Sequence, residues 1–483
     1  MTTNTLVAKI WSFCDTLRDD GLGYGDYLEQ LTYLLFLKMA DENPNDYNLP
    51  KGCNWQVLLR LEKGDLISQY ETILKSLAKS GGMLTKIFVG AQNKIHDSSK
   101  LKKLIKLIDE ENWTLKDTDI KGDIYESLLQ KNAENSGAGQ YFTPRSVITA
   151  IVNCIQPKPE EIISDPSCGT GGFFLGALEY LLKKRLNPKQ KRLLKFDTFH
   201  GWEIESSTAR LCLMNLFLHG IGDLKDTPDI EVTDSLKIQP KMGVDIVLAN
   251  PPFGKSSSDI PTIDEKQAKK DGYFLRKDFW VTTSNKQLAF LQHIVSMLKE
   301  NGRAAVVLPD NVLFEGGAGE TIRKKLLEEI NLHTILRLPT GIFYAQGVKA
   351  NVLFFKKKKK VSKPATKEIW YYDYRTNVNH TPKKKPLRFE NLHEFCKCYL
   401  SRKREERKEK WSKKNPEGRW RKYSYKDIIA RDKINLDITW LKDSNLIDLD
   451  NLPDSNVLLD NIIENVESSL ASFKVIKETI DSE

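Results

Sequence analysis

The spacing of apolar residues divides the chain into a helical first part and a second part in which short strands alternate with helices. Before about residue 130, apolar positions recur every three or four residues, as on one face of a helix. These positions include Trp11, Leu17, Tyr27, Leu28, Leu31, Leu34, Leu35 and Leu37. The segments are separated by Gly21, Pro44, Pro50 and Gly81–Gly82. The pattern predicts an N-terminal all-helical domain over residues 1–133, in which catalytic residue types do not cluster.

From residue 134 the pattern changes to short apolar runs that alternate with longer helical segments. The runs are Ile162–Ser164, Thr198–Trp202, Val244–Ala249, Ala304–Leu308, Thr334–Leu338 and Asn351–Phe355. Several of them end in loops rich in Gly, Pro, Asp or Asn, as strands of α/β domains do. The alternation predicts an α/β domain over residues 134–395, built on a mostly parallel, doubly wound, Rossmann-like sheet. Ligands of such sheets bind at the carboxyl ends of the strands.

The last part of the chain, residues 396–483, is predicted to be a basic linker followed by a helical tail. Apolar residues with helical spacing in the tail are Leu459, Ile463, Val466, Leu470, Phe473 and Ile480, with Lys477 interrupting the series. Such a seam suits packing against a helix of another subunit or in a coiled coil. An ordinary core helix of the same chain is the alternative.

Composition and charge indicate a soluble protein with an anionic partner. The chain has 483 residues, a formal net charge of +9 and seven cysteines without paired metal-ligand spacing. We find no apolar stretch for a membrane span and no signal-peptide pattern, so we expect a cytoplasmic protein without a metal site. Lysine and arginine concentrate at residues 356–360, 383–385 and 402–422. Any one run is ordinarily solvated surface, but three in one region favour contacts with nucleic-acid phosphates.

A glycine-rich loop follows the first predicted strand and opens an apolar helix. Its sequence is Asp165-Pro166-Ser167-Cys168-Gly169-Thr170-Gly171-Gly172-Phe173. The glycines permit a tight turn and a close approach of the backbone to a ligand, which the N-terminal amides of the helix would face. The Lys-Ser/Thr ending of a phosphate-binding loop is absent, which argues against a nucleoside triphosphatase.

Acidic residues at the ends of the next two strands favour a nucleoside-containing cofactor. Glu203 follows Gly201-Trp202 and can accept both ribose hydroxyls, whereas Glu205 could be a solvated residue of the next helix. Asp234 would end the third strand beside the adenine ring of the cofactor, although acidic residues are common in such loops. Cys168 could suggest covalent attack on a cytosine ring, but we reject this role because the thiol lies among the glycines of the cofactor loop.

The tetrapeptide Asn250-Pro251-Pro252-Phe253 directly follows the apolar strand Val244–Ala249. An adenine amino group is a poor nucleophile because its lone pair is delocalised into the ring. The Asn250 side-chain carbonyl and a proline backbone carbonyl, most simply that of Pro251, can each accept one of its N–H hydrogens and direct the lone pair at a methyl donor. Proline fixes the backbone direction, and Phe253 offers a face for base stacking. A Pro-Pro turn after a strand is the structural alternative.

Together, the glycine loop, Glu203 and the tetrapeptide predict S-adenosyl-L-methionine-dependent methylation of a planar amino group. These residues resemble the modification subunit of type I restriction-modification systems, and the resemblance covers most of the chain. It extends to residues 139–146, 214–220, 283–290 and 308–317. The order of the motifs is similar to that of the gamma class of amino-methyltransferases. Ser167 stands where many relatives have Ala, and Tyr141 where many have Phe.

The resemblance implies the substrate and some further cofactor contacts. It implies methyl transfer to the N6 amino group of adenine in DNA, and a buried duplex amino group is reached by base flipping. It also implies that Tyr141, Phe142 and Thr143 lie near the methionine portion of the cofactor. The polar segment 255–283 is expected to be a loop that orders around the flipped base.

Partners also follow from the resemblance. A separate specificity subunit would select the DNA site, and a second copy of the modification subunit would flank that site. A restriction (translocase) subunit is left open as a further partner. The helical tail would dock on helices of the specificity subunit.

Two other functions stay open at this point. The same tetrapeptide type serves enzymes that methylate guanine amino groups in RNA or a glutamine in protein, and the basic clusters argue only against the protein substrate. A catalytically silent subunit of a DNA-binding assembly is the other alternative, and it predicts that S-adenosylmethionine does not bind.

Overall fold

The computed structural model describes most of the chain and divides it into two compact units, Met1–Thr439 and Trp440–Glu483. The described residues are 3–18, 21–43, 49–111, 118–135, 142–240, 243–254, 260–343, 348–359, 364–381, 385–401 and 403–443. Tyr141 and the predicted tail helix at residues 459–480 lie outside these ranges. No helix of the described residues is long and apolar enough to cross a membrane. The following description concerns the first unit.

The first part of the chain is helical, as its periodicity predicts. Its helices are α1 (Thr3–Arg18), α2 (Tyr24–Glu42), α4 (Trp55–Arg60), α5 (Lys63–Leu77), α6 (Gly82–Phe88), α7 (Ser98–Asp109) and α8 (Thr118–Asn135). Helix α7 illustrates how the sequence produces these helices. The Asp97 side chain caps it by accepting hydrogen bonds from two backbone N–H groups of the first turn. Its buried residues Leu101, Leu104, Ile105 and Ile108 then follow one helical face.

The second part folds around a mixed nine-stranded sheet in the order β11-β10-β8-β9-β7-β4-β1-β2-β3. The strands are β1 (Ile163–Asp165), β2 (Phe199–Glu203), β3 (Asp229–Val232), β4 (Val244–Ala249), β7 (Leu298–Pro309), β8 (Asn331–Arg337), β9 (Ala350–Lys356), β10 (Glu368–Asp373) and β11 (Trp420–Ser424). Strands β3, β2, β1, β4 and β7 pair in parallel, whereas β9 runs antiparallel to β7 and β8. The structure confirms the Rossmann-like fold class.

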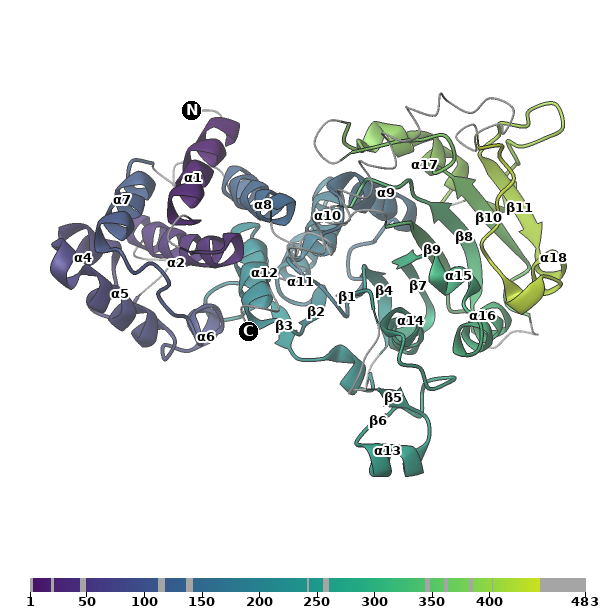
Figure 1. Cartoon of the computed structure of the whole chain (residues 1–483), viewed down its shortest axis with the longest axis horizontal. Helices are drawn as coiled ribbons and strands as arrows, with labels where there is room; N and C mark the ends of the chain where they lie inside the picture. Colours follow the sequence, from purple (N-terminus) through teal and green to yellow (C-terminus); the bar gives the residue numbers. More distant parts are fainter. Residues whose placement is uncertain are drawn as a thin grey trace, which may run out of the picture. The chain divides into compact units, whose positions relative to one another are not determined.

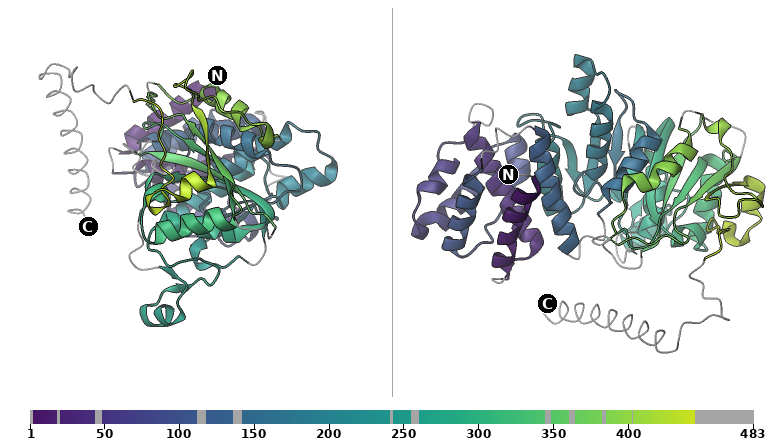
Figure 2. Two further views of the ribbon diagram at one scale, coloured as in Figure 1. Left: turned by 90° about the vertical axis from the view of Figure 1, so that its right-hand side faces the viewer. Right: turned by 90° about the horizontal axis from the view of Figure 1, so that it is seen from above.

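Helices cover both faces of this sheet, as expected for a doubly wound fold. They are α9 (Arg145–Ile155), α10 (Gly172–Leu182), α11 (Pro188–Phe196), α12 (Ser206–Leu218), α14 (Lys286–Met297), α15 (Asn311–Phe314), α16 (Ala318–Glu329), α17 (His393–Tyr399) and α18 (Tyr425–Ile429). Helices α9 and α17 lie on one face, and α14 and α16 on the other (Figures 1 and 2). Strand β4 is therefore buried between two helical layers, which explains why all its residues except Asp245 are apolar.

Two segments differ from the sequence prediction. Strand β11 lies within the predicted basic linker, yet it pairs antiparallel with β10 and extends the sheet beyond residue 395. Trp420 is buried and its ring stacks on Trp370, but the basic residues Arg421 and Lys422 follow it directly, and so charge masks the strand pattern. The segment predicted as a loop after Phe253 contains β5 (Pro261–Thr262), α13 (Glu265–Asp271) and β6 (Phe274–Leu275).

Helix α12 joins the helical part of the unit to the sheet. It packs against α2, α6 and α8 on one side and against β2 and β3 on the other. Its Arg210 is buried and donates hydrogen bonds to the Glu29 carboxylate of α2 and, over 3.1 Å, to the Val89 carbonyl. Because both charged groups are removed from water, each depends on the other for compensation.

Removal of one partner of this buried ion pair should destabilise the protein strongly. We expect Arg210→Met to lower the free energy of unfolding by about 3 kcal/mol, because the Glu29 carboxylate is left buried without its guanidinium. Urea denaturation measures this change. The double variant Glu29→Leu/Arg210→Met removes both charges and should recover most of the loss. Equal destabilisation by the single and double variants would show that packing, and not the uncompensated charge, carries the effect.

Candidate active site

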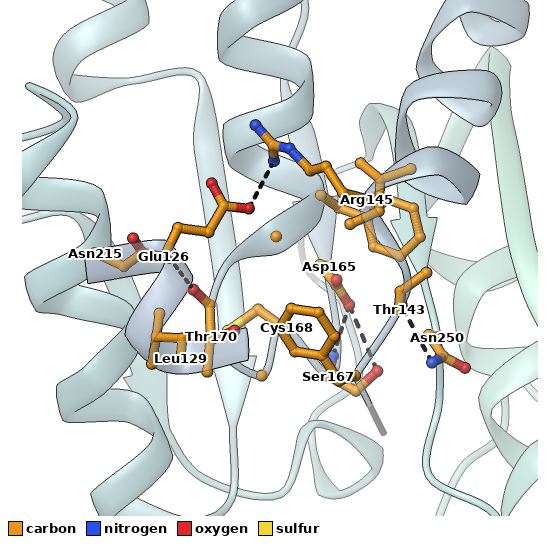
Figure 3. A pocket seen from close by; sticks show the side chains of 15 residues that line it. Glu126, Leu129, Thr143, Arg145, Asp165, Ser167, Cys168, Thr170, Asn215 and Asn250 are labelled. Atoms are coloured by element: carbon orange, nitrogen blue, oxygen red, sulfur yellow. Dashed lines mark hydrogen bonds and ion pairs between the residues drawn. The ribbon is translucent and has the colours of Figure 1, made fainter. Parts of the chain in front are cut away.

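The ends of three parallel strands bring the predicted site residues to one edge of the sheet. Ile163 of β1 is in register with Phe199 of β2 and with Ile246 of β4, so these strands end at the same edge. Asp165, Glu203 and Asn250 lie at or directly after those ends. A pocket at this edge is lined by Glu126, Leu129, Phe142, Thr143, Arg145, Ile148, Asp165, Ser167, Cys168, Gly169, Thr170, Gly172, Phe173, Asn215 and Asn250 (Figure 3).

The backbone of the glycine loop requires glycine at two positions. Gly169 and Gly171 have φ angles of +54° and +83°, which side chains with a Cβ rarely adopt. A Cβ at Gly171 would also lie 3.1 Å from Cys212 Sγ, whereas a Cβ at Gly169 would meet nothing within 4 Å. The loop is fixed to the sheet because the Cys168 N–H donates to the Trp202 carbonyl over 2.9 Å. Open space beside Gly169 permits the close approach of a ligand.

Glu203 is held in place by the glycine loop and by its own strand end. Its carboxylate accepts hydrogen bonds of 3.0 Å each from the Gly169 and Glu205 backbone N–H groups. The neighbouring Ile204 is 63% exposed and Val232, at the end of β3, is 54% exposed, which is unusual for large apolar residues. An acidic group beside exposed apolar side chains suits a nucleoside. The acidic group can accept hydrogen bonds from the ribose hydroxyls, and the apolar side chains can contact the base. Asp234 caps a short helical turn by accepting from the Leu236 N–H.

Asp165 is buried at the end of β1 with only 2% exposure. Burial raises the pKa of its carboxyl group to about 8, and the charge of Glu203 acts in the same direction. Hydrogen bonds from Ser167 oppose this shift of the pKa. Asp165 is therefore mostly protonated near neutral pH and orders the loop through the Ser167 N–H, 3.0 Å from its Oδ1.

Asn250 contacts a segment that precedes it by a long stretch of chain. Its Nδ2 donates to Thr143 Oγ1 over 3.0 Å, and both residues are buried. In this bond the Asn250 amide nitrogen is the donor and the Thr143 hydroxyl oxygen is the acceptor. Behind the tetrapeptide, Gln287 Nε2 donates to the Pro252 carbonyl over 3.4 Å, and the Lys286 N–H donates to the Gly254 carbonyl. Phe253 is half-buried.

Cys168 lines the pocket but is unsuited to nucleophilic attack. Its Sγ lies 4.0 Å from Cys212 Sγ, and only 6% of the residue is exposed. Contact with the Cys212 thiol and burial both hold the pKa of Cys168 well above its ordinary value. A thiol that stays protonated is a poor nucleophile. This environment agrees with the packing role that the sequence suggests.

The pocket contains several residues that the sequence pattern did not single out for it. Glu126, Leu129, Arg145, Ile148 and Asn215 line it, whereas the predicted residues Pro166, Gly171, Glu203 and Asp234 lie outside its lining. Glu126 belongs to α8, far from the motifs in sequence, and no local pattern marks it. Arg145 and Asn215 fall in segments that support the family resemblance, but their position in the pocket depends on how α9 and α12 pack.

The fold and the site define a class of protein. A Rossmann-like sheet carries a glycine loop at the end of β1 and an acidic group beside exposed apolar side chains at the end of β2. These residues fit S-adenosyl-L-methionine. The carboxylate can accept hydrogen bonds from its ribose hydroxyls, the apolar side chains can contact its adenine, and the open glycine backbone leaves space for the rest of the molecule. The protein is an S-adenosylmethionine-dependent methyltransferase.

Comparisons with known proteins identify the family. The chain matches the model of N-6 DNA Methylase over residues 116–438 and that of the HsdM N-terminal domain over residues 6–108. It is 39% identical to the methylase subunit of the type I restriction enzyme EcoKI from Escherichia coli K12, across 95% of this chain and 92% of that subunit. The StySJI methylase subunit of Salmonella typhimurium is equally similar. The chain belongs to the N-6 DNA methylase family, as a type I modification subunit of the adenine-specific DNA methyltransferase class.

Solved structures support this assignment. The EcoKI M protein is 33% identical and superimposes with a TM-score of 0.55 over 97% of this chain and 94% of that one. A modification subunit of a putative type I restriction enzyme from Vibrio vulnificus is 27% identical, with a TM-score of 0.69 over 88% of this chain and 93% of that one. The similarity thus includes the helical first part as well as the sheet.

The pKa of Asp165 predicts how stability depends on pH. In the unfolded chain the carboxyl ionises near pH 4, but in the folded protein it keeps its proton until about pH 8. The folded state therefore binds one more proton in this window, and the free energy of unfolding falls as the pH rises from 5 to 8. Asp165→Asn cannot ionise and should lose less stability over this range. Melting temperatures of both proteins measure this, and parallel pH profiles would contradict the assignment.

Loss of the Thr143 hydroxyl should impair methyl transfer through the orientation of Asn250. Thr143→Val keeps the shape of the side chain but removes the acceptor for Asn250 Nδ2. We expect kcat for DNA methylation to fall about five- to tenfold, as for the loss of one neutral hydrogen bond. Thr143→Ser retains the hydroxyl and should keep most of the activity. Equal rates in the Val and Ser variants would show that the hydrogen bond does not orient the amide.

Proposed function

We propose that this chain transfers the methyl group of S-adenosylmethionine to the N6 amino group of an adenine flipped out of DNA. The observation that supports this most directly is the position of Asn250 at the edge of the glycine-loop pocket, with its amide nitrogen engaged by Thr143. The amide oxygen is thereby oriented as a hydrogen-bond acceptor. The bound cofactor would supply an electrophilic methyl group on a sulfonium centre.

In this proposal, two carbonyl groups hold the adenine amino group. One N–H of the amino group donates to Asn250 Oδ1 and the other donates to the Pro251 backbone carbonyl. Pro251 is favoured over Pro252 because the Pro252 carbonyl already accepts from Gln287 Nε2. Both bonds pull the nitrogen toward tetrahedral geometry and localise its lone pair, so that catalysis consists of positioning and electrostatic stabilisation.

The same proposal assigns Phe253 and the remaining cofactor residues. The half-buried Phe253 ring stacks on the flipped base, which offsets part of the stacking lost from the duplex. Asp165, Gly169 and their loop neighbours bind the cofactor, and Glu203 accepts from its ribose hydroxyls. A permanently strong base is not needed, because the amino proton becomes acidic once the methyl group has been transferred.

We also infer partners for the chain. Its relatives bear the names of subunits of type I restriction enzymes, and a structure 26% identical to it comes from work on complex assembly of a type I system. A separate specificity subunit would therefore select the DNA site, next to a second modification subunit, and a restriction subunit could join the assembly. The tetrapeptide then acts on whichever adenine the specificity subunit delivers.

The basic runs of the sequence do not all support a nucleic-acid substrate to the same extent. Lys356 and Lys357 lie at the opposite ends of the strands from Asn250. Strand β9 runs antiparallel to β7, so it starts beside the carboxyl end of β7, on the same side of the sheet as Asn250, and runs away from it. Lys357 Nζ donates to the Val295 and Leu298 carbonyls at the end of α14, which is a structural role. Lys413 and Lys414 are exposed in the loop before β11, a strand that starts beside the carboxyl ends of β10 and β8, so these lysines could contact phosphates.

The main prediction concerns Asn250. We expect Asn250→Ala to lower the rate of methyl transfer to duplex DNA by at least about a thousandfold, as for the loss of a group that acts in the transition state. Its affinity for S-adenosylhomocysteine should stay within about threefold of the wild-type value, since the substitution removes no cofactor-loop residue. Radiolabelled methyl transfer, with the specificity subunit present, and calorimetry provide the two measurements.

A matched control separates this role from general damage to the fold. Asn153→Ala removes an amide of α9 that donates within its own helix to the Thr149 carbonyl, and it should leave both quantities unchanged. Full activity of Asn250→Ala would overturn the mechanism. Transfer to RNA in preference to DNA by the wild-type protein would overturn the assigned substrate.

A further inference from the structure

The two neighbours of strand β4 in the sheet separate the two reactants around Asn250. Strand β1, which carries the glycine loop, pairs with β4 on one side, and β7 pairs with β4 in parallel on the other side. Because the loop after β1 takes the methyl donor, we expect the DNA to reach Asn250 from the side of β7. The segment that follows β7 therefore borders the path of the DNA.

That segment is the short helix α15, which leaves one large apolar side chain exposed. Val312 and Leu313 are buried, whereas Phe314 is 43% exposed. The backbone before Phe314 is fixed, because the Val312 carbonyl accepts from Arg323 Nη1 over 3.1 Å and the Leu313 carbonyl accepts from the Leu436 N–H over 2.8 Å. A single exposed apolar residue is ordinary on a protein surface, so its position and its rigid support decide its meaning.

Glu315, the residue after Phe314, connects α15 to the tetrapeptide that begins at position 250. Its carboxylate accepts from Asn285 Nδ2 over 2.7 Å. Helix α14 begins one residue later, and the Lys286 N–H donates over 3.1 Å to the carbonyl of Gly254, the residue directly after the tetrapeptide. The exposed ring therefore belongs to the same hydrogen-bonded frame as the catalytic residues.

A strained turn places a cation next to α15. Lys433 and Ile434 have φ angles of +51° and +50°, in the left-handed region that a β-branched residue rarely adopts. The buried Arg323 holds this conformation, because it donates to the Lys433 carbonyl over 2.6 Å and to the Ile434 carbonyl over 3.0 Å. Lys433 is exposed, and a Cβ at Gly316 would lie 3.5 Å from its Cδ. Strain of this kind persists where the surroundings enforce it, and it clusters at functional sites.

We propose that Phe314 and Lys433 form a contact surface for the DNA duplex beside the flipped adenine. This inference rests on the proposed function and names residues that hold the opened duplex. The Phe314 ring packs as a wedge against the base pair that is uncovered when the adenine leaves the stack. The Lys433 ammonium contacts a neighbouring phosphate, which positions the duplex without reading its sequence.

The same buried side chain positions both parts of this surface. Arg323 donates to the Val312 carbonyl, two residues before the ring, and to the carbonyl of the cation itself. A wedge on a rigid support loses little conformational freedom when it enters the DNA, so more of its stacking energy is available for binding. An apolar ring beside a cation also matches the two surfaces of an opened duplex, which are uncovered base faces and phosphates.

The test for the wedge uses the chain with its specificity subunit and a duplex in which 2-aminopurine replaces the adenine that the complex methylates. The fluorescence of 2-aminopurine rises when the base leaves the stack. We expect Phe314→Ala to weaken DNA binding about tenfold, as for the loss of a stacking side chain, and to lower the fluorescence rise at saturating protein. Phe314→Leu keeps an apolar wedge and should retain most of the rise.

The test for the cation is the salt dependence of DNA binding. Lys433→Gln removes one phosphate contact and should reduce the slope of log affinity against log salt concentration by about one. Leu182→Ala and Lys183→Gln are the matched controls for the two positions. Both residues are exposed at the end of α10, a helix that begins at the glycine loop and runs away from it. These control variants should behave as the wild type does.

S-adenosylhomocysteine should bind all of these variants with wild-type affinity, which separates the DNA contact from damage to the fold. Wild-type DNA affinity and fluorescence in Phe314→Ala would overturn the wedge and leave the proposed methyl transfer standing. A loss confined to binding of the specificity subunit would assign the surface to a protein partner and overturn the DNA contact. Methylation by the wild-type complex without any fluorescence rise would overturn the flipped adenine, and this inference with it.

Discussion

The parallel pairing of β1 with β2 and β4 is the constraint on which the site depends. Backbone hydrogen bonds fix the register of these strands, and a shift by one residue would turn every side chain to the opposite face. Asp165, Glu203 and Asn250 come from distant parts of the sequence, yet each lies where one of the three strands ends. The two helical layers that bury β4 make this register costly to change. Loop residues therefore acquire precise positions from a rigid sheet.

Electrostatics at the carboxyl edge follow from the same burial. Burial raises the pKa of Asp165 to about 8, so the side chain is mostly uncharged near neutral pH. It then acts as a hydrogen-bond acceptor for the Ser167 N–H and not as a charge. Glu203 lies closer to solvent. Burial also raises the pKa of its carboxyl group, but the backbone N–H groups of Gly169 in the loop and of Glu205 after β2 favour the ionised form. The two acidic groups thus have different tasks, because their surroundings differ more than their chemistry does.

Helix α12 makes the helical part and the sheet a single structure. Arg210 on this helix pairs with Glu29 of α2, Cys212 packs beneath the glycine loop, and Asn215 holds the Thr170 carbonyl. Helix α12 therefore links the helical part to the glycine loop through direct side-chain contacts.

The sequence by itself determined the strand–helix alternation, the glycine loop and the tetrapeptide, because each depends on local rules. The spacing of apolar residues predicts the alternation, the backbone freedom of glycine predicts the loop, and the chemistry of an amide beside proline predicts the role of the tetrapeptide. Strand β4 was predicted with its observed bounds, Val244–Ala249. The many charged residues of segment 402–422 obscured strand β11. This strand exists because it pairs with β10, which lies well before it in the sequence. Only the tertiary structure decided that Thr143 accepts a hydrogen bond from Asn250 and that Glu126 lines the pocket. Those contacts join residues far apart in sequence, and they exist because α8, α9 and α12 pack beside the sheet edge.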